Sequence, residues 1–96
     1  MWLRRPKPPA AEPLPVTLYR KQGCGLCDQA ELTLAKISKR VPLHVRTVDI
    51  DSDEALQRRY FLEVPVVVVR GEEVARAPIS ERVLADTLAE IASHRR

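Results

Sequence analysis

Four consecutive valines, Val66–Val69, place the strongest constraint on how this chain folds. Side chains of a strand point alternately to the two faces of its sheet, so a strand that is apolar at every position is expected to be buried on both faces. We therefore predict a central strand with a neighbour at each edge. A chain of 96 residues is long enough for one such core and too short for a second folded domain.

Two more strands and a helix are predicted before this strand. Alternating apolar residues predict strands at 16–19 and 43–48, and Pro42 ends the helix between them. A strand–helix–strand order predicts two parallel strands joined by a right-handed crossover. The buried face of the helix, over 26–41, is expected to carry Leu26, Ala30, Leu34, Ile37 and Val41.

The second half of the chain adds a short helix, a hairpin and a last helix. Asp51 followed by Glu54 resembles a capping box and predicts a helix through about Tyr60. A turn at 70–73 leads to a short fourth strand at 74–77, and Ser80 is placed to cap the final helix. The order is βαβ, a short helix and then ββα. This order predicts an α/β sandwich in which a four-stranded mixed sheet is flanked by helices.

The two ends of the chain hold most of its positive charge. Residues 1–15 contain five of the eight prolines and carry a net +2, and Arg95 with Arg96 adds +2. Because the whole chain carries +3, residues 16–94 carry −1. We expect an extended Pro-rich tail over 1–15 and a folded domain over 16–96. A nearly neutral body without an aromatic platform does not predict nucleic-acid binding.

Neither a membrane helix nor an export signal is evident in the sequence. No stretch approaches the ~18 apolar residues of a membrane helix, and the tail lacks the continuous apolar region of a secretory signal. We therefore expect a cytoplasmic protein with no membrane partner. As a separate expectation, the chain is a monomer. Two cysteines are too few for a disulfide scaffold, so a bridge between them would be local or functional.

Those two cysteines form the motif Cys24-Gly25-Leu26-Cys27, where the first strand passes into the first helix. A spacing of three brings both sulfurs to one side of the first helical turn, with a Cα separation compatible with the ~4.4–6.8 Å range of disulfides. The helix N-terminus stabilises a thiolate by ~0.3–2 kcal/mol. Even the largest of these values lowers a cysteine pKa only from ~8.5 to about 7. Lys21, three residues before Cys24, is the nearest candidate cation to lower the pKa of this thiol further. We expect the exposed Cys24 to be the nucleophile, and Cys27 to resolve the mixed disulfide formed on it.

With its surroundings, this motif resembles the thioredoxin-like superfamily, and within it the glutaredoxins and small glutaredoxin-like proteins. The likeness extends over residues 16–92 and includes Val16–Tyr19, the two cysteines, residues 48–51 and Val64-Pro65. It implies a thioredoxin-like sandwich in which Pro65 is cis and faces the cysteines. It also implies that the Val64 backbone pairs with an extended substrate or with glutathione, and that Lys21 supports the glutathione carboxylate.

The resemblance implies an enzyme of cell redox homeostasis, a dithiol oxidoreductase that reduces protein or glutathione mixed disulfides. Cys24 and Cys27 would form its redox-active centre, and its partner would be a disulfide-containing protein or glutathione. No permanently bound cofactor is expected, because glutathione or a reductase would supply the electrons. Glu63, where glutaredoxins commonly have Thr, places a negative charge near the docking position of the anionic tripeptide. The sequence therefore leaves both reductants open.

Three other interpretations of the cysteine pair are open. In the first, the two cysteines are only small buried hydrophobic residues, since free cysteines are commonly buried. A protein-binding module of the same fold would recruit a partner through the Pro-rich tail or the Val64-Pro65 groove, without catalysis. A zinc or iron–sulfur carrier would need further ligands, such as His44 and His94 or a second chain. Because these histidines lie 50 residues apart, unlike those of a zinc finger, we expect no metal site.

Overall fold

The structure is a computed structural model that describes residues 12–94 of the chain. Most of the tail predicted over 1–15 lies outside the described residues. The first strand starts at Leu14, which is fully buried, so the folded domain begins slightly before the predicted residue 16. The elements in chain order are β1 (Leu14–Arg20), α1 (Gly25–Ser38), β2 (Leu43–Asp49), the 3₁₀ helix η1 (Ile50–Ser52), α2 (Glu54–Tyr60), β3 (Val66–Val69), β4 (Glu72–Arg76) and α3 (Glu81–Ser93).

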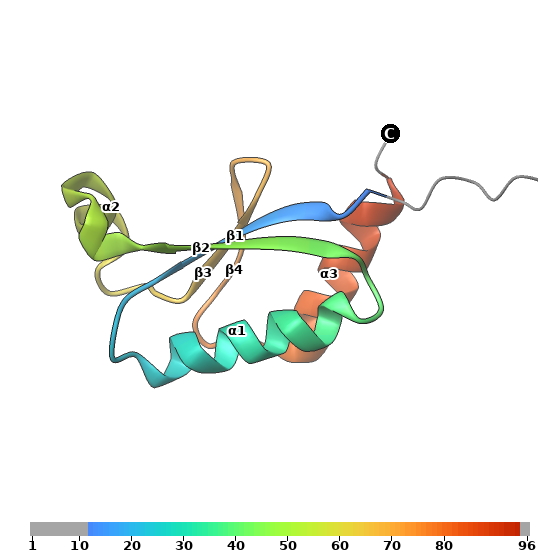
Figure 1. Cartoon of the computed structure of the whole chain (residues 1–96), viewed down its shortest axis with the longest axis horizontal. Helices are drawn as coiled ribbons and strands as arrows, with labels where there is room; N and C mark the ends of the chain where they lie inside the picture. Colours follow the sequence, from blue (N-terminus) through green and yellow to red (C-terminus); the bar gives the residue numbers. More distant parts are fainter. Residues whose placement is uncertain (1–11, 95–96) are drawn as a thin grey trace, which may run out of the picture.

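The four strands form one mixed sheet in the order β2-β1-β3-β4 (Figure 1). β1 and β2 are parallel and are connected through α1, whereas β3 runs antiparallel to both β1 and β4. β3 thus has a neighbour at each edge, as its four valines predict. The predicted α/β architecture with a four-stranded mixed sheet is confirmed.

β3 and β4 are joined by a tight turn at Arg70-Gly71. Both residues have a positive φ, 54° for Arg70 and 80° for Gly71, and this combination is typical of a two-residue type I′ hairpin. Val69 pairs with Glu72 directly across the turn. The fourth strand therefore starts two residues before the predicted 74–77.

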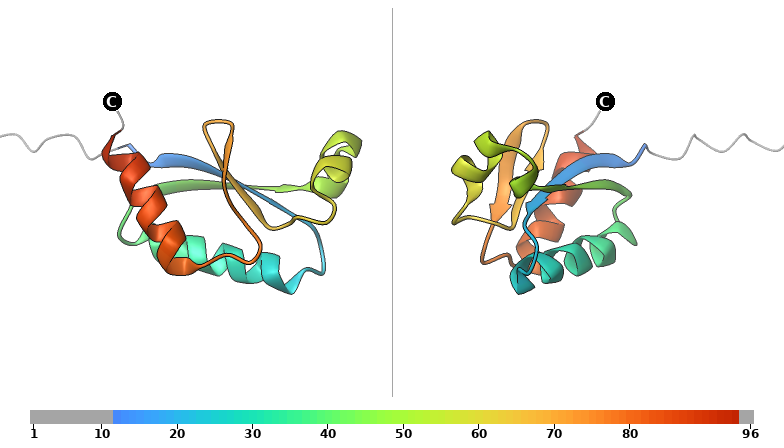
Figure 2. Two further views of the ribbon diagram at one scale, coloured as in Figure 1. Left: turned by 180° about the vertical axis from the view of Figure 1, so that it is seen from behind. Right: turned by 60° about the vertical axis from the view of Figure 1, so that its left-hand side comes forward.

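The helices cover the two faces of the sheet unequally (Figures 1 and 2). α1 and α3 lie on one face, whereas α2 lies at one end of the sheet on the opposite side. No helix within residues 12–94 is long and apolar enough to span a membrane. The main core fills the space between the sheet and the helices α1 and α3, and its buried side chains are Leu14, Val16, Leu18, Ala30, Leu34, Ile37, Val67, Val69, Leu84 and Leu88.

A smaller group, the minor cluster, packs near α2. Its buried members are Ile50, Tyr60 and Val66, with Tyr19 among the partly buried residues against them. The Tyr19 and Tyr60 rings stack with their centroids 4.8 Å apart. Val68, which also packs here, is only partly buried, because α2 covers just one end of this face. The expectation of complete burial is thus confirmed for three of the four valines.

The N-terminus of α3 agrees with the prediction from the sequence, whereas that of α2 does not. Ser80 caps α3 as predicted, because its hydroxyl accepts a hydrogen bond from the Val83 N–H at 3.2 Å. The prediction that Asp51 caps α2 is wrong, since Asp51 lies in η1. The Asp53 carboxylate is the cap, and it accepts hydrogen bonds from two N–H groups in the first turn of α2.

Leu26 corrects the predicted buried face of α1. Ala30, Leu34 and Ile37 are buried in the main core, but Leu26 is 55% exposed. The reason is that a hollow, rather than core side chains, lies against the first turn of α1. Leu26 therefore belongs to the surface around the cysteines.

Candidate functional site

The cysteine pair is placed by the backbone turn between β1 and α1. β1 ends at Arg20, and Gly23 has a φ of +70°, which a residue with a side chain rarely adopts. Cys24 follows with extended backbone angles and is the N-cap of α1. Its sulfur accepts a hydrogen bond from the Cys27 N–H at 3.2 Å, in the manner of a capping side chain. The sequence therefore places one sulfur directly on the helix N-terminus.

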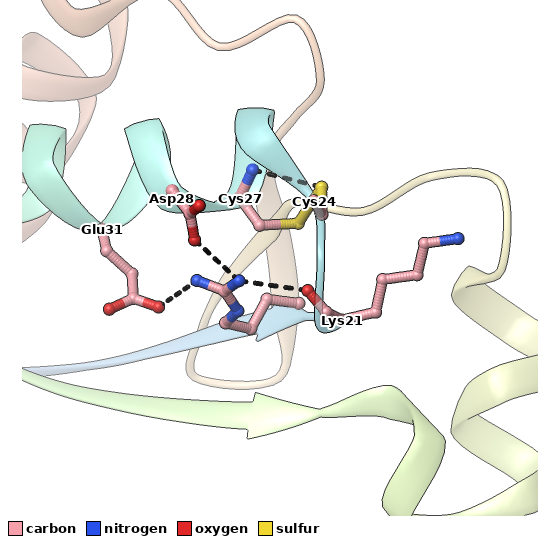
Figure 3. Close-up of a disulfide and its surroundings, with 6 residues drawn as sticks. Lys21, Cys24, Cys27, Asp28 and Glu31 are labelled. Atoms are coloured by element: carbon pink, nitrogen blue, oxygen red, sulfur yellow. Dashed lines mark hydrogen bonds and ion pairs between the residues drawn. A yellow bond between two sulfur atoms is a disulfide. The ribbon is translucent and has the colours of Figure 1, made fainter.

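Cys24 and Cys27 are joined by a disulfide, with their Cα atoms 5.2 Å apart (Figure 3). Cys24 is half-buried, whereas Cys27 is fully buried in the first turn of α1. The predicted placement of the two sulfurs agrees with this geometry. Reagents from solvent reach Cys24 before they reach Cys27.

Pro65 lies close to the motif, although 38 residues separate it from Cys27 in the sequence. The Val64–Pro65 peptide bond is cis, as the resemblance implies. Val66 pairs with Tyr19 near the end of β1, so the start of β3 lies beside the turn that leads to the cysteines. Pro65 is fully buried and Val64 is partly buried.

A hollow of about 200 Å³ adjoins the motif and connects it to Pro65. The sequence-predicted Pro65 and the unexpected Leu26 line it together. Pro78, which also follows a cis peptide bond, was not identified by sequence reasoning. The lining residues are Leu26, Gln29, Ala30, Thr33, Pro65, Ala77, Pro78 and Ile79.

Lys21 has its ammonium group 5.1 Å from the centroid of the Phe61 ring. Figure 3 shows the Lys21 side chain directed away from the disulfide. Its predicted roles, as a cation for the Cys24 thiolate or for a glutathione carboxylate, stay predictions. The geometry does assign it one contact, a cation–π interaction with the end of α2.

Arg20 is a residue of the site that sequence reasoning missed. Its guanidinium donates hydrogen bonds to Asp28 at 2.8 Å, to the Lys21 carbonyl at 3.1 Å and to Glu31 (Figure 3). The hydrogen bond to Asp28 and the two nearby carboxylates raise the Arg20 pKa above its ordinary value, despite partial burial. The signal in the sequence is the spacing of three between Asp28 and Glu31, which places both on one helix face.

Exposed apolar side chains also occur around the site. Leu26 is joined by Phe61 and Leu62 at the end of α2, which are 53% and 88% exposed. Single exposed apolar side chains are common on folded proteins, and a contiguous patch of them is what marks a contact surface. Within residues 12–94 no group of three or more His, Cys, Asp or Glu is placed to hold a metal ion.

Comparisons with known proteins support the resemblance found in the sequence. A family model described as Glutaredoxin-like domain (DUF836) matches residues 15–89. The target protein XcR50 from X. campestris has a similar structure, with a TM-score of 0.69 and 36% identity over 78% of this chain and 96% of that one. Protein Ne2328 from Nitrosomonas europaea is similar with a TM-score of 0.70 and 28% identity, covering 80% and 93% of the two chains.

A thioredoxin shares the fold at a greater distance. A mutant thioredoxin from Halobacterium salinarum NRC-1 is 21% identical, with a TM-score of 0.64 over 90% of this chain and 81% of that one. At this identity the likeness shows the fold alone, which is thioredoxin-like as predicted. No curated protein matches the chain.

Proposed function

This chain belongs to the glutaredoxin-like domain family, and on that premise we propose that it is a thiol-disulfide oxidoreductase with Cys24 and Cys27 as its reaction centre. Its fold and its Cys-x-x-Cys pair are consistent with a redox role. One observation carries the proposal further. A half-buried cysteine caps a helix, accepts an N–H hydrogen bond on its sulfur and is bonded to a fully buried cysteine one turn later. This difference in exposure to solvent suits a nucleophilic thiol that meets the substrate and a resolving thiol that is protected from it.

The first proposed step uses the reduced protein. The Cys24 thiolate attacks one sulfur of a substrate disulfide, so a Cys24–substrate disulfide forms and the substrate's own S–S bond breaks. The other substrate sulfur leaves as a thiolate and takes a proton from water. The Cys27 N–H, 3.2 Å from the Cys24 sulfur, stabilises negative charge at this position before the attack.

The second step resolves the mixed disulfide. Cys27 loses its proton and its thiolate attacks the Cys24 sulfur, which releases the remaining substrate sulfur as a thiolate. The Cys24–Cys27 disulfide forms, and two electrons have passed to the substrate. A second dithiol, or two molecules of glutathione, must return these electrons before the next cycle. The short Cα separation of 5.2 Å allows the bridge to form without a large movement of the backbone.

The substrate is proposed to lie along Val64 and Pro65. The Val64 N–H already donates to the Tyr60 carbonyl at 3.3 Å, so pairing of a substrate with that N–H requires this bond to be exchanged. The hollow lined by Leu26 and Pro65 supplies a surface with both apolar and polar side chains next to the cysteine motif. We propose a disulfide-containing protein or a glutathione mixed disulfide as substrate, no permanently bound cofactor, and a monomer in the cytoplasm as the working form.

A turnover assay tests this function. With dithiothreitol as reductant and insulin as substrate, the wild-type chain should accelerate insulin reduction, and Cys24→Ser should remove the acceleration. Lys36→Met, which changes an exposed residue at the far end of α1, is the matched control and should keep it. Equal and uncatalysed rates for wild type and Cys24→Ser would refute the proposal.

A second candidate is a non-catalytic protein-binding module. The same hollow and the exposed Phe61 and Leu62 favour it, because they offer apolar contacts that do not depend on a thiol. The pH dependence of iodoacetamide alkylation separates the two functions. A reduced Cys24 that reacts like an ordinary free thiol would favour the binding module, whereas a reactive thiolate near neutral pH favours the oxidoreductase.

A further inference from the structure

Arg20 lies at the end of β1, immediately before the turn that carries Cys24. Only 13% of its side chain is exposed, in contrast to Asp28 at 68% and Glu31 at 43%. An arginine whose side chain is mostly buried and whose guanidinium has three acceptors is held more firmly than a typical surface ion pair.

The three contacts of Arg20 connect both sides of the cysteine motif. The hydrogen bond to the Lys21 carbonyl, at 3.1 Å, holds the turn before Cys24. The contacts with Asp28 and Glu31 hold the first two turns of α1, which follow Cys24. Asp28 is itself tied to the motif, since its N–H donates to the Cys24 carbonyl at 3.0 Å. One side chain therefore bridges the segments that enter and leave the reaction centre.

Arg20 also changes the charge around Cys24. Asp28 lies in the first turn of α1, close to the helix N-terminus on which a Cys24 thiolate would depend. An uncompensated carboxylate there opposes a second negative charge on the sulfur. The guanidinium, 2.8 Å from Asp28, offsets that carboxylate.

We propose that Arg20 is a positioning residue for Cys24, which joins the turn before the cysteines to α1 and offsets the charge of the Asp28 carboxylate beside them. This inference rests on the proposed function of Cys24 as the nucleophile. Charged groups on the neighbouring segments have contacts of their own. Lys21 is directed to Phe61, Asp49 accepts from the Gln22 side chain at 3.4 Å, and Glu63 pairs with Arg76 at 3.3 Å.

The test measures the rate of Cys24 alkylation by iodoacetamide against pH in the reduced full chain, with Cys24 identified by peptide mass spectrometry. Arg20→Met should move the midpoint of the profile upward by roughly 0.5, which slows alkylation at pH 6 about threefold. Asp28→Asn should move it in the opposite direction by a similar amount. In the double variant the two changes should largely cancel, and Arg20→Lys should recover part of the loss.

Lys36→Met is the matched control. It removes the same charge from the protein and breaks the Lys36–Glu81 ion pair, whose groups lie 3.4 Å apart at the other end of α1. Its profile should match that of the wild type. The proposal is overturned if Arg20→Met behaves like this control, or, should Arg20→Met not fold, if Asp28→Asn leaves the profile unchanged. Insulin reduction by the wild type is measured alongside, so that failure of the oxidoreductase function is seen separately.

Discussion

The main core and the minor cluster differ in size and in the parts of the chain they hold. The main core contains ten buried side chains between the sheet and two long helices, and the minor cluster contains three. Yet the minor cluster is attached to both loops of the site. Tyr19 leads into the turn before Cys24, and the Tyr60 carbonyl accepts hydrogen bonds from the Glu63 and Val64 N–H groups at 2.8 and 3.3 Å. We infer that the main core supplies most of the stability, whereas the minor cluster sets the geometry of the site.

The largest effect is expected from a substitution in the main core, and it is a loss of stability. Leu34→Ala removes most of a side chain that is 1% exposed, and we expect a loss of about 2–5 kcal/mol in the free energy of unfolding, measured by urea denaturation. In the fraction that remains folded, the alkylation rate of the reduced Cys24 should be unchanged. A Leu34→Ala protein with normal stability, or with a strongly altered Cys24 rate, would contradict the division of roles.

A matched pair of smaller substitutions sharpens the comparison. Ile37 in the main core and Ile50 in the minor cluster are 1% and 0% exposed. Ile37→Val and Ile50→Val should each cost roughly 0.5–1.5 kcal/mol of stability, because both delete one buried methylene.

Their effects on activity should differ. Ile50→Val loosens the packing of Tyr60 and should lower kcat/KM for insulin reduction roughly threefold. Ile37→Val should leave kcat/KM within experimental error of the wild type. Equal losses of kcat/KM in both variants would remove the special role of the minor cluster.

The smallest effect concerns the pH dependence of stability. Burial raises the pKa of the Tyr60 hydroxyl above its ordinary value, so the unfolded chain loses this proton at a lower pH than the folded protein does. The contribution of Tyr60 is fully present below its unfolded pKa, about 10, and is lost as the pH rises through the folded value. Tyr60→Phe should reduce the fall in stability between pH 9 and pH 11, as measured by urea denaturation. An unchanged fall would show that Tyr60 does not contribute to it.

The sequence predicts the fold well because its strongest signals are local. The run Val66–Val69, the helical spacing of Ala30, Leu34 and Ile37, and the position of the cysteines between a strand and a helix each depend on neighbours in the chain. These predictions agree with the structure in the central position of β3, the burial of Ala30, Leu34 and Ile37, and the location of the disulfide.

The differences arise where local patterns compete or where distant segments meet. Asp51 and Asp53 are both able to cap a helix, and the extra turn η1 decides in favour of Asp53. Leu26 lines a hollow together with Pro78, which is 52 residues away in the sequence. The spacing of Asp28 and Glu31 shows that they share a helix face, but no local pattern shows that the end of a strand places Arg20 against that face.

Trapping of a mixed disulfide tests the central claim most directly. The reduced Cys27→Ser and Cys24→Ser variants are each mixed with insulin whose disulfides are intact, under the same conditions. The adducts are measured by intact-protein mass spectrometry. We predict a stable adduct on Cys24 in Cys27→Ser, because the resolving thiol is missing, and little or no adduct in Cys24→Ser, because Cys27 is fully buried. An adduct on Cys27 as abundant as that on Cys24, or none in either variant, would contradict the assignment of Cys24 as the nucleophile.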